Sequence, residues 1–504
     1  MSDAAIQAFQ AALGAAHVRV NADVSSHRDP YLFGDGARFA PLAVAMPSSV
    51  PELQAVLAVA REHRVPLWTV STGKNLGYGG AAPRVSGSVV VDLQRMNRIL
   101  EVNEELGFAV VEPGVRFLDL YAHLQTHGHK LMMSVPDIGW GSLIGNSLER
   151  GFGYTAMWDH AASQCGLEVL LADGRLVRTG MGAKTDSTTW HLYKGGFGPS
   201  LDGLLQQSNF GVVTRMGVSL VPQPETAVIC MIKTKRVSDL GELIDGLRPL
   251  MLNGTIQSNP VVGNATVIAS MMTDRVKWWQ GEGAMSESAV QTMAEGLDLG
   301  RWNARFGLYG DATICAARLK IVRTMVNRIA GAELVVREYP GSVAAQDAHP
   351  ADHAQLGIPG LALLRMAEWR GGAPAHTDFS LVCPATARDT HRQHQFIQSH
   401  IEQAGFDYAG GFVLQGRYAI ALALLAFDRE HATQPQQVQS LFERLITEAS
   451  ALGYAPYRAH LAFMDQISEQ YDFNHHAMRD VAQSLKRALD PLGILSQGKQ
   501  GIWT

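Results

Sequence analysis

The sequence has few cysteines. Only four of its 504 residues are cysteine, and no two of them form a CxxC pair. Disulfide scaffolds and thiolate zinc sites both need more cysteines at closer spacing, so both are excluded. We expect reduced, mostly buried thiols of the kind found in cytosolic proteins. The four are Cys165, Cys230, Cys315 and Cys383.

An excess of positive charge and long apolar runs are also missing. The formal net charge is −5, whereas non-specific nucleic-acid binding requires clustered Lys and Arg. No basic segment precedes an apolar run at the N-terminus, so no signal peptide is predicted. The longest apolar run, 418–427, is too short to span a bilayer and is typical of a buried strand. We therefore expect a cytoplasmic protein that binds neither nucleic acid nor membrane.

Several catalytic motifs are absent. No GxGxxG stands between a strand and a helix, and there is no GxxxxGK[ST], HExxH or GxSxG. The histidine pairs His391/His394 and His475/His476 lack a third ligand at a sensible spacing. The sequence therefore predicts neither a nicotinamide-type Rossmann site nor a metal site.

The length and patterning indicate a globular α+β protein. A chain of 504 residues with 46% hydrophobic residues predicts two or three domains. Ser49 and Glu52 have the spacing of an N-cap and its N3 partner, before an apolar-faced helix. Apolar alternation predicts hairpins over 99–113 and 166–180. Residues 226–460 repeat a strand-then-helix rhythm, which predicts an antiparallel sheet with helices on one face.

Two loops are dense in glycine and small polar residues. The first, 71–80 (STGKNLGYGG), directly follows a predicted buried strand. Glycines let a backbone approach an anion closely, and successive N–H groups form an anion-binding nest. A β-bulge with a hairpin turn is the alternative for this stretch. The second loop, 136–146, continues to 151–154 and by itself indicates only irregular structure.

These motifs together resemble a known flavoprotein family. The two loops in this order, the following Asp159-His160 and the SNFGVVT stretch at 208–214 resemble the FAD-binding domain of the vanillyl-alcohol oxidase and p-cresol methylhydroxylase family. The run YRAHLAFMDQ at 457–466 and the closing DPLGILSQGKQGIW resemble the same family. The resemblance extends from about residue 40 to the end and is weakest over 226–360. Within the family, the vanillyl-alcohol and eugenol oxidase branch is nearest.

The resemblance implies a two-domain PCMH-type FAD-binding fold with an antiparallel-sheet cap. The implied parts are an N-terminal extension (1–39), an FAD-binding domain (40–222), a cap (223–468) and a C-terminal segment that returns to the FAD-binding domain (469–504). The residues that match cofactor-binding positions are Ser71, Thr72, Gly73, Lys74, Asn75, Leu76, Pro136, Ser142, Gly145, Asn146, Asp159, His160, Gly211, Val212, His376 and Lys499. The pyrophosphate is expected on the backbone of 71–76, in agreement with the nest.

His376 lies in the segment GGAPAHTDFSLVCP. By itself it is typical of a surface-loop histidine. In the oxidase branch, a histidine joined covalently to the flavin 8α-methyl matches this position, so the resemblance implies covalent FAD. Relatives usually have aromatic residues directly after this histidine, whereas this chain has Thr377-Asp378.

Five further residues match the reaction centre of the family. Tyr78, Tyr457 and Arg458 match its phenolate-binding trio, although alone Tyr78 could be a packed loop aromatic and Arg458 a surface charge. A phenol has a pKa near 10, so binding it ionised at pH 7 costs about 4 kcal/mol. Hydrogen bonds to a charged group contribute about 1.5–3 kcal/mol each, so several donors are needed. Asp137, otherwise a turn or N-cap residue, matches an acid/base at the benzylic carbon, and Tyr154 matches a tyrosine near the reaction centre.

The resemblance implies an FAD-dependent oxidase of para-substituted phenols: 4-hydroxybenzyl alcohols, 4-alkylphenols or 4-allylphenols, as in the catabolism of lignin-derived aromatic compounds. A benzylic hydride passes to flavin N5, a p-quinone methide results, and dioxygen becomes hydrogen peroxide. A cytochrome c-coupled dehydrogenase or hydroxylase of the same fold stays open, and a non-catalytic flavin-binding protein is a remote alternative. A homodimer is implied. Trp140 and Trp158 replace smaller or different residues of the relatives, which leaves the preferred para substituent open.

Overall fold

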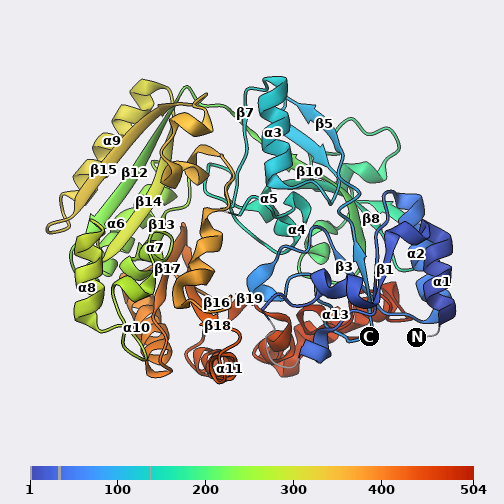
Figure 1. Ribbon diagram of the computed structural model, residues 1–504. Coiled ribbons are helices and arrows are strands. Elements are labelled where there is room, and N and C mark those ends of the chain that lie inside the picture. Colours follow the sequence, from blue (N-terminus) through green and yellow to red (C-terminus); the bar gives the residue numbers. More distant parts are fainter. Residues whose placement is uncertain (1–2, 32–35, 137) are drawn as a thin grey trace.

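The computed structural model describes residues 3–31, 36–136 and 138–504. Figure 1 shows two halves side by side, with N-terminal elements in one and the yellow and orange segments in the other. Strands β16, β18 and β19 lie where the halves meet. This arrangement matters because residues from both halves meet there.

The first half contains a small sheet with the strand order β1-β2-β4-β3, in which β2, β4 and β3 run parallel. Parallel strands of one sheet require a crossover, which α2 provides between β2 and β3 on either side of β4. The Ser49 hydroxyl caps this helix by accepting a hydrogen bond from the Glu52 amide, as its spacing predicts. The elements are α1 (Asp3–Leu13), β1 (Val18–Val20), β2 (Ala43–Ala45), α2 (Val50–His63), β3 (Leu67–Val70) and β4 (Val89–Asp92).

A second, antiparallel sheet follows, with the order β5-β6-β10-β8-β9. The predicted hairpins are its β5–β6 and β8–β9 pairs. Helix α3 ends at Gly128, which adopts the left-handed conformation typical of a helix C-terminus. The elements are β5 (Ile99–Asn103), β6 (Phe108–Val111), α3 (Phe117–His127), β7 (Leu131–Met132), α4 (Leu143–Leu148), α5 (His160–Ser163), β8 (Gln164–Leu170), β9 (Leu176–Arg178), β10 (Val212–Ser219) and β11 (Val221–Pro222).

The C-terminal segment packs against this first half. The Leu67 amide donates to the Ile494 carbonyl at 2.7 Å. Lys486, fully buried on α13, donates to Asp490 at 2.7 Å and to the Asn209 carbonyl at 2.9 Å. A buried ammonium needs such partners, because burial lowers its pKa and disfavours its charge. The elements are α12 (Met464–Glu469) and α13 (Phe473–Leu489), with left-handed residues at 474–476 inside α13.

The second half is built on an eight-stranded antiparallel sheet with the order β15-β12-β14-β13-β17-β18-β16-β19. Its strands are β12 (Thr226–Thr234), β13 (Val261–Asn264), β14 (Trp302–Gly310), β15 (Glu333–Pro340), β16 (Pro374–Pro384), β17 (Ala409–Gln415), β18 (Tyr418–Asp428) and β19 (Pro456–Arg458). Its helices are α6 (Leu240–Leu252), α7 (Ala265–Ser270), α8 (Glu287–Gly296), α9 (Ala312–Val326), α10 (Ala387–Gln403) and α11 (Gln434–Ala451).

Helices cover both faces of this sheet, so the expectation of helices on one face was wrong. Helices α6, α9, α10 and α11 pack with Ala423, Leu425 and Phe427 of β18 on one face. Residues of α7 and α8 pack with Leu424 and Ala426 on the other. The reason is the continuous apolar run of β18, whose alternate residues point to opposite faces and must both be buried.

Two further features agree with the sequence. The α+β class with an antiparallel-sheet half is confirmed. All four cysteines are free and buried. Among the described residues, no helix is long and apolar enough to cross a membrane, and no group of three or more His, Cys, Asp or Glu side chains could hold a metal ion.

Candidate active site

Arg458 is the centre of a polar cluster where the two halves meet. Its guanidinium carbon lies 4.4 Å from the centre of the Tyr78 ring, and its Nη2 donates to Asn75 Oδ1 at 2.7 Å. The Tyr457 hydroxyl is electrostatically coupled to the Arg458 guanidinium, each acting on the pKa of the other. The structure thus brings together the three residues expected to bind a phenolate. We call Tyr78, Tyr457 and Arg458 the phenol clamp.

Two segments position the clamp. Tyr78 ends the 3₁₀ turn η4 (Leu76–Tyr78), whereas Tyr457 and Arg458 lie on β19. Strand β19 pairs with β16 so that Arg458 is opposite Ser380, and the Ser380 hydroxyl is 3.4 Å from the Tyr78 hydroxyl. Gly77 allows this approach, because a Cβ there would lie 2.7 Å from Asp378 Oδ2 and 2.8 Å from His376 Nε2.

The electrostatics keep protons on all three clamp residues. Burial raises the pKa of the Tyr78 hydroxyl, with a contribution from Asp378, and outweighs the opposing effect of Arg458. Burial likewise raises the pKa of Tyr457. For Arg458, burial acts to lower the pKa, but Tyr78, Tyr457 and Glu149 raise it above its ordinary value. The clamp therefore presents two hydroxyl donors and one permanent cation at neutral pH.

A row of polar residues on β16 extends from the clamp. His376, Asp378 and Ser380 alternate along the strand and share one face. His376 Nε2 is 3.6 Å from Asp378 Oδ2, and the His376 ring is 5.0 Å from the ring of Tyr31. Burial, with Asp378 as the next cause, raises the pKa of Tyr31 to about 12. The same strand thus holds the residue expected to carry the flavin and two side chains near the clamp.

The two glycine-rich loops meet beside this row. A Cβ at Gly145 would collide with Ser71 Oγ, so the start of the first loop lies against α4. The Ser142 hydroxyl caps α4 by accepting from the Gly145 amide at 3.1 Å. Lys74 Nζ lies 5.6 Å from the centre of the Trp140 ring, which gives the unusual tryptophan a partner in the first loop.

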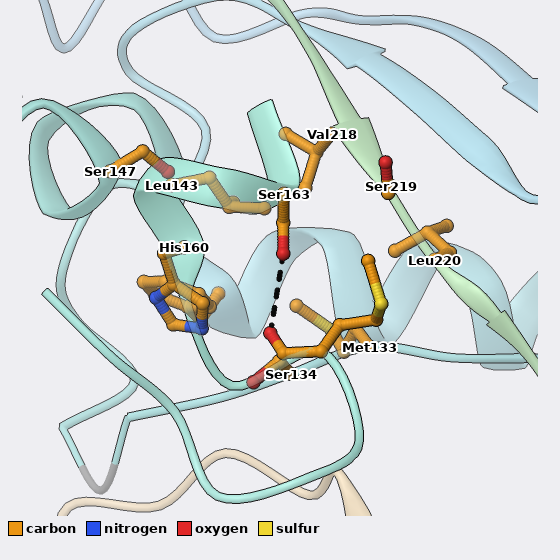
Figure 2. A pocket seen from close by; sticks show the side chains of 11 residues that line it. Met133, Ser134, Leu143, Ser147, His160, Ser163, Val218, Ser219 and Leu220 are labelled. Atoms are coloured by element: carbon orange, nitrogen blue, oxygen red, sulfur yellow. Dashed lines mark hydrogen bonds between the residues drawn. The ribbon is translucent and has the colours of Figure 1, made fainter. Parts of the chain in front are cut away.

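His160 lies in a narrow pocket of the first half. Figure 2 shows its ring and the Ser134 hydroxyl on one side of the pocket, with Ser219 and Leu220 opposite. His160 Nδ1 donates to Asn146 Oδ1 at 2.6 Å, and its Nε2 has no partner in the described part of the chain. Burial lowers the pKa of His160 to about 3, so the ring is neutral at pH 7. Two expected cofactor residues, Asn146 and His160, are therefore held together, with an acceptor nitrogen free for a ligand.

Other expected residues pack against the sheets of the first half. Val212 is buried in the core of the first sheet, and Gly211 packs against Val169. Tyr154 is buried in the core of the second sheet, where its carbonyl is 3.4 Å from the Tyr309 hydroxyl. Asp137 lies outside the described residues.

Lys499 is connected to the clamp through Glu149. Its Nζ is 2.5 Å from Glu149 Oε1, and Glu149 acts electrostatically on Arg458. Burial raises the pKa of Glu149, but Lys499 and Arg458 outweigh it and lower the pKa overall. Lys499 is thus linked to Arg458 through a carboxylate that the sequence analysis did not select.

Several residues around the clamp escaped sequence reasoning. Gln207 donates to the Tyr457 carbonyl at 2.8 Å, and Asn75 bonds Arg458 although we expected it to bind the cofactor. Asp378 and Ser380 could have been found from the sequence, because they follow His376 at steps of two residues and a strand places such residues on one face. Glu149 and Gln207 carry no such signal.

Buried polar atoms without partners test whether the site suits a large polar cofactor. In the described part of the chain they include Ser134 Oγ, Thr155 Oγ1, His160 Nε2, Gln164 Oε1 and Nε2, Asn209 Oδ1 and His376 Nδ1. Native proteins rarely leave such atoms unsatisfied, so a ligand with many donors and acceptors fits them. The close approach of the two glycine-rich loops fits the same ligand. These residues are therefore suited to FAD.

Comparison with known proteins supports this assignment. A family model described as "FAD binding domain" matches residues 41–180, and one described as "FAD linked oxidases, C-terminal domain" matches 385–500. The chain is 33% identical over 505 residues to the 4-cresol dehydrogenase (hydroxylating) flavoprotein subunit of Pseudomonas putida, covering 99% of this chain and 95% of that one. The chain belongs to the vanillyl-alcohol oxidase and p-cresol methylhydroxylase family.

Two solved structures are similar to this chain over nearly its whole length. A 4-ethylphenol oxidase from Gulosibacter chungangensis has a TM-score of 0.94 and 35% identity, over 99% of this chain and 97% of that one. p-Cresol methylhydroxylase with substrate bound has a TM-score of 0.94 and 31% identity over the same shares. The expected family, the two-domain PCMH-type fold, the FAD cofactor and the flavin-dependent oxidoreductase activity are confirmed.

Proposed function

We propose that the protein is an FAD-dependent oxidase of para-substituted phenols. The observation that carries the proposal is the phenol clamp, in which the Arg458 cation faces two tyrosines that keep their protons. Relatives named for 4-cresol and 4-ethylphenol support the substrate class. Candidate substrates are 4-hydroxybenzyl alcohols, 4-alkylphenols and 4-allylphenols, including those released from lignin.

In this proposal the clamp binds the substrate as phenolate. Ionising a phenol at pH 7 costs about 4 kcal/mol. Two hydroxyl donors and a guanidinium, at about 1.5–3 kcal/mol each, can offset that cost, whereas one donor cannot. The negative oxygen makes the ring electron-rich and weakens the benzylic C–H bond for hydride loss. When bound, FAD supplies the acceptor for that hydride.

After hydride loss the clamp holds a neutral p-quinone methide by the same oxygen. It then takes up water or loses a proton, which gives an alcohol, an aldehyde or an alkene. Asp137 is proposed to move this proton, and Tyr154 to lie near the reacting carbon, as implied by the family.

FAD is proposed to lie along residues 71–76, 142–146 and 159–160 and to be joined to His376. The position of His376 on β16, with an unpartnered buried Nδ1, supports the covalent link. Replacing His376 with Ala should leave the flavin extractable by acid precipitation, whereas wild-type protein keeps its fluorescence in the pellet. Flavin in the wild-type supernatant would refute the link.

Dioxygen is the proposed electron acceptor, with hydrogen peroxide as product. A cytochrome c-coupled dehydrogenase or hydroxylase is the second candidate, because one relative is named as a dehydrogenase flavoprotein subunit. The homodimer and the cytoplasmic location stay predictions.

An anaerobic flavin-reduction screen over 4-substituted phenols tests the proposal. Bleaching of the flavin absorbance by 4-hydroxybenzyl alcohol, 4-ethylphenol or eugenol is expected. A flavin that stays oxidised with every phenol would end the proposal. Peroxide formation in air, compared with reduction of an artificial acceptor, then separates the oxidase from the dehydrogenase.

A further inference from the structure

Asp378 is the carboxyl group that faces the phenol clamp from β16. It lies two residues from Ser380, on the same strand face, and Ser380 is itself 3.4 Å from the Tyr78 hydroxyl and opposite Arg458 in register. Two residues along a strand span about 6–7 Å, so Asp378 precedes Ser380 on the same face at the distance of the next side chain on that face. Its side chain is 26% exposed, so a small molecule can reach it.

The groups that face Asp378 come from four segments. The titratable and charged ones are Tyr31, Tyr78, His376, Tyr457 and Arg458. In the described part of the chain its carboxylate accepts no hydrogen bond, and His376 Nε2 lies 3.6 Å from its Oδ2. Burial raises the pKa of Asp378 against the opposing effects of His376 and Arg458. A carboxylate without donors is a stronger base than an ordinary aspartate.

A phenol that binds as phenolate must lose its hydroxyl proton to some group. Tyr78 and Tyr457 hold their own protons, and Arg458 is permanently charged, so the clamp itself contains no acceptor. Protonation of His376 would add a second cation to the site. Protonation of Asp378 leaves the net charge of the site unchanged, because one anion replaces another beside Arg458.

We propose that the Asp378 carboxylate accepts the hydroxyl proton of the bound phenol, so that the substrate becomes phenolate as the aspartate becomes neutral. The inference rests on the proposed function and names the residue that ionises its substrate. The phenol O–H bond breaks and an O–H bond forms on Asp378. No electron is transferred and no proton leaves the protein.

This internal transfer has a thermodynamic signature. When proton donor and acceptor are both inside the complex, binding neither takes up nor releases protons, and the apparent Kd is constant with pH below the pKa of the phenol. If Asp378 is replaced by Asn, the phenol proton must go to solvent. Binding then releases one proton, and the apparent Kd falls tenfold for each unit of pH.

The experiment uses the FAD-containing protein and 4-bromophenol, which has no benzylic C–H bond and cannot be oxidised there. Titration calorimetry at pH 7 in phosphate and in Tris, which differ in ionisation enthalpy, counts the protons released. Wild type should release none and keep the same Kd from pH 7 to pH 9. Asp378→Asn should release one proton and bind about a hundredfold more tightly at pH 9 than at pH 7. Asp378→Glu, which keeps the carboxylate, should behave as wild type.

The outcomes separate the inference from the proposed function. Wild type that releases one proton overturns the inference alone, and this count is decisive even if the asparagine variant does not fold. An asparagine variant that binds without releasing a proton also overturns it, because the phenol then binds neutral. Wild type that binds no 4-bromophenol and is reduced by no phenol overturns the proposed function itself.

Discussion

Two aspartates of the second half, Asp378 and Asp407, are both enclosed by protein but are held in opposite ways. The Asp407 carboxylate accepts from Arg275 Nε at 2.6 Å, from the Met285 amide at 2.7 Å and from Trp369 Nε1 at 2.9 Å. Its side chain is only 2% exposed. Asp378 has only His376 Nε2 at 3.6 Å from its Oδ2, and its side chain keeps 26% exposure.

The difference teaches how a protein separates structural from reactive carboxylates. A carboxylate with three donors in place is satisfied by hydrogen bonds and holds the segments that carry those donors together. A carboxylate that is desolvated without donors is held at a higher free energy, which a proton relieves. Asp407 therefore fixes the loops around it, whereas Asp378 is available to the substrate. Each can be tested by removing a group on which its role depends.

The largest expected effect is on catalysis. It follows from removing Arg458, the cation that lies near both Asp378 and the proposed phenolate. Arg458→Ala should lower kcat/KM for a 4-alkylphenol by about 100- to 5000-fold, because an unpaired buried charge costs about 3–5 kcal/mol. Steady-state kinetics measure it, with Arg388→Ala as the control, since that side chain is 86% exposed. Equal kinetics for the two variants would contradict the phenol clamp.

For Asp407 the expected loss is in stability. Asp407→Asn should lower the free energy of unfolding by about 3–5 kcal/mol, because Arg275 and Arg370 are left without their carboxylate in a buried site. Urea denaturation measures it, and kcat/KM of the folded fraction should stay unchanged. Asp480→Asn, at an exposed position of α13, is the matched control. An Asp407 variant as stable as wild type would break the comparison.

The buried histidine His160 predicts how the stability of the protein depends on pH. The folded-state pKa of His160 is lowered to about 3, so between pH 6.5 and pH 3 the unfolded chain binds a proton that the folded protein does not. The contribution of neutral His160 to the free energy of unfolding is complete above pH 6.5. Below pH 6.5 it falls by about 1.4 kcal/mol per pH unit. His160→Gln, which can still donate to Asn146, should retain about 2 kcal/mol more stability at pH 5 than wild type, relative to pH 7.

Urea denaturation at pH 7 and pH 5 measures this difference. His431→Gln, at an exposed position, is the matched control. Parallel curves for His160→Gln and wild type would show that burial does not hold the ring neutral.

The smallest effect is expected at Ser380, the neighbour of Asp378 on the same strand face. Its hydroxyl lies 3.4 Å from that of Tyr78, a long hydrogen bond worth about 0.5–1.5 kcal/mol. Ser380→Ala should therefore lower kcat/KM only about 2- to 10-fold. A loss above 100-fold would mean that Ser380, rather than Asp378, handles the substrate proton.

Much of the fold could be predicted because its signals are local. The Ser49 cap, the two hairpins and the buried strand 418–427 follow from spacing and periodicity within a few residues, and all are present. The helices on the second face of the large sheet were missed. A strand that is buried on both faces is continuously apolar whether helices or other segments cover it. The apolar run 418–427 therefore could not predict which elements pack on each face of the sheet.

The candidate site was predictable only where a family motif marked the residues. Tyr78, Tyr457 and Arg458 were named from the sequence, and the structure brings them together. Asn75, Glu149 and Gln207 were not assigned to the clamp, because their contacts join segments far apart in the chain. No local pattern records such pairings.

The sequence by itself determined which kinds of groups are available: glycine-rich loops after strands, free thiols, a tyrosine–arginine pair and the alternation of His376, Asp378 and Ser380. The tertiary structure decided which of them face one another and which carboxylate lacks donors. That decision rests on the pairing of β16 with β19 and the packing of η4 against Asp378. Desolvation and missing hydrogen bonds are properties of packing, so they exist only once these distant segments meet.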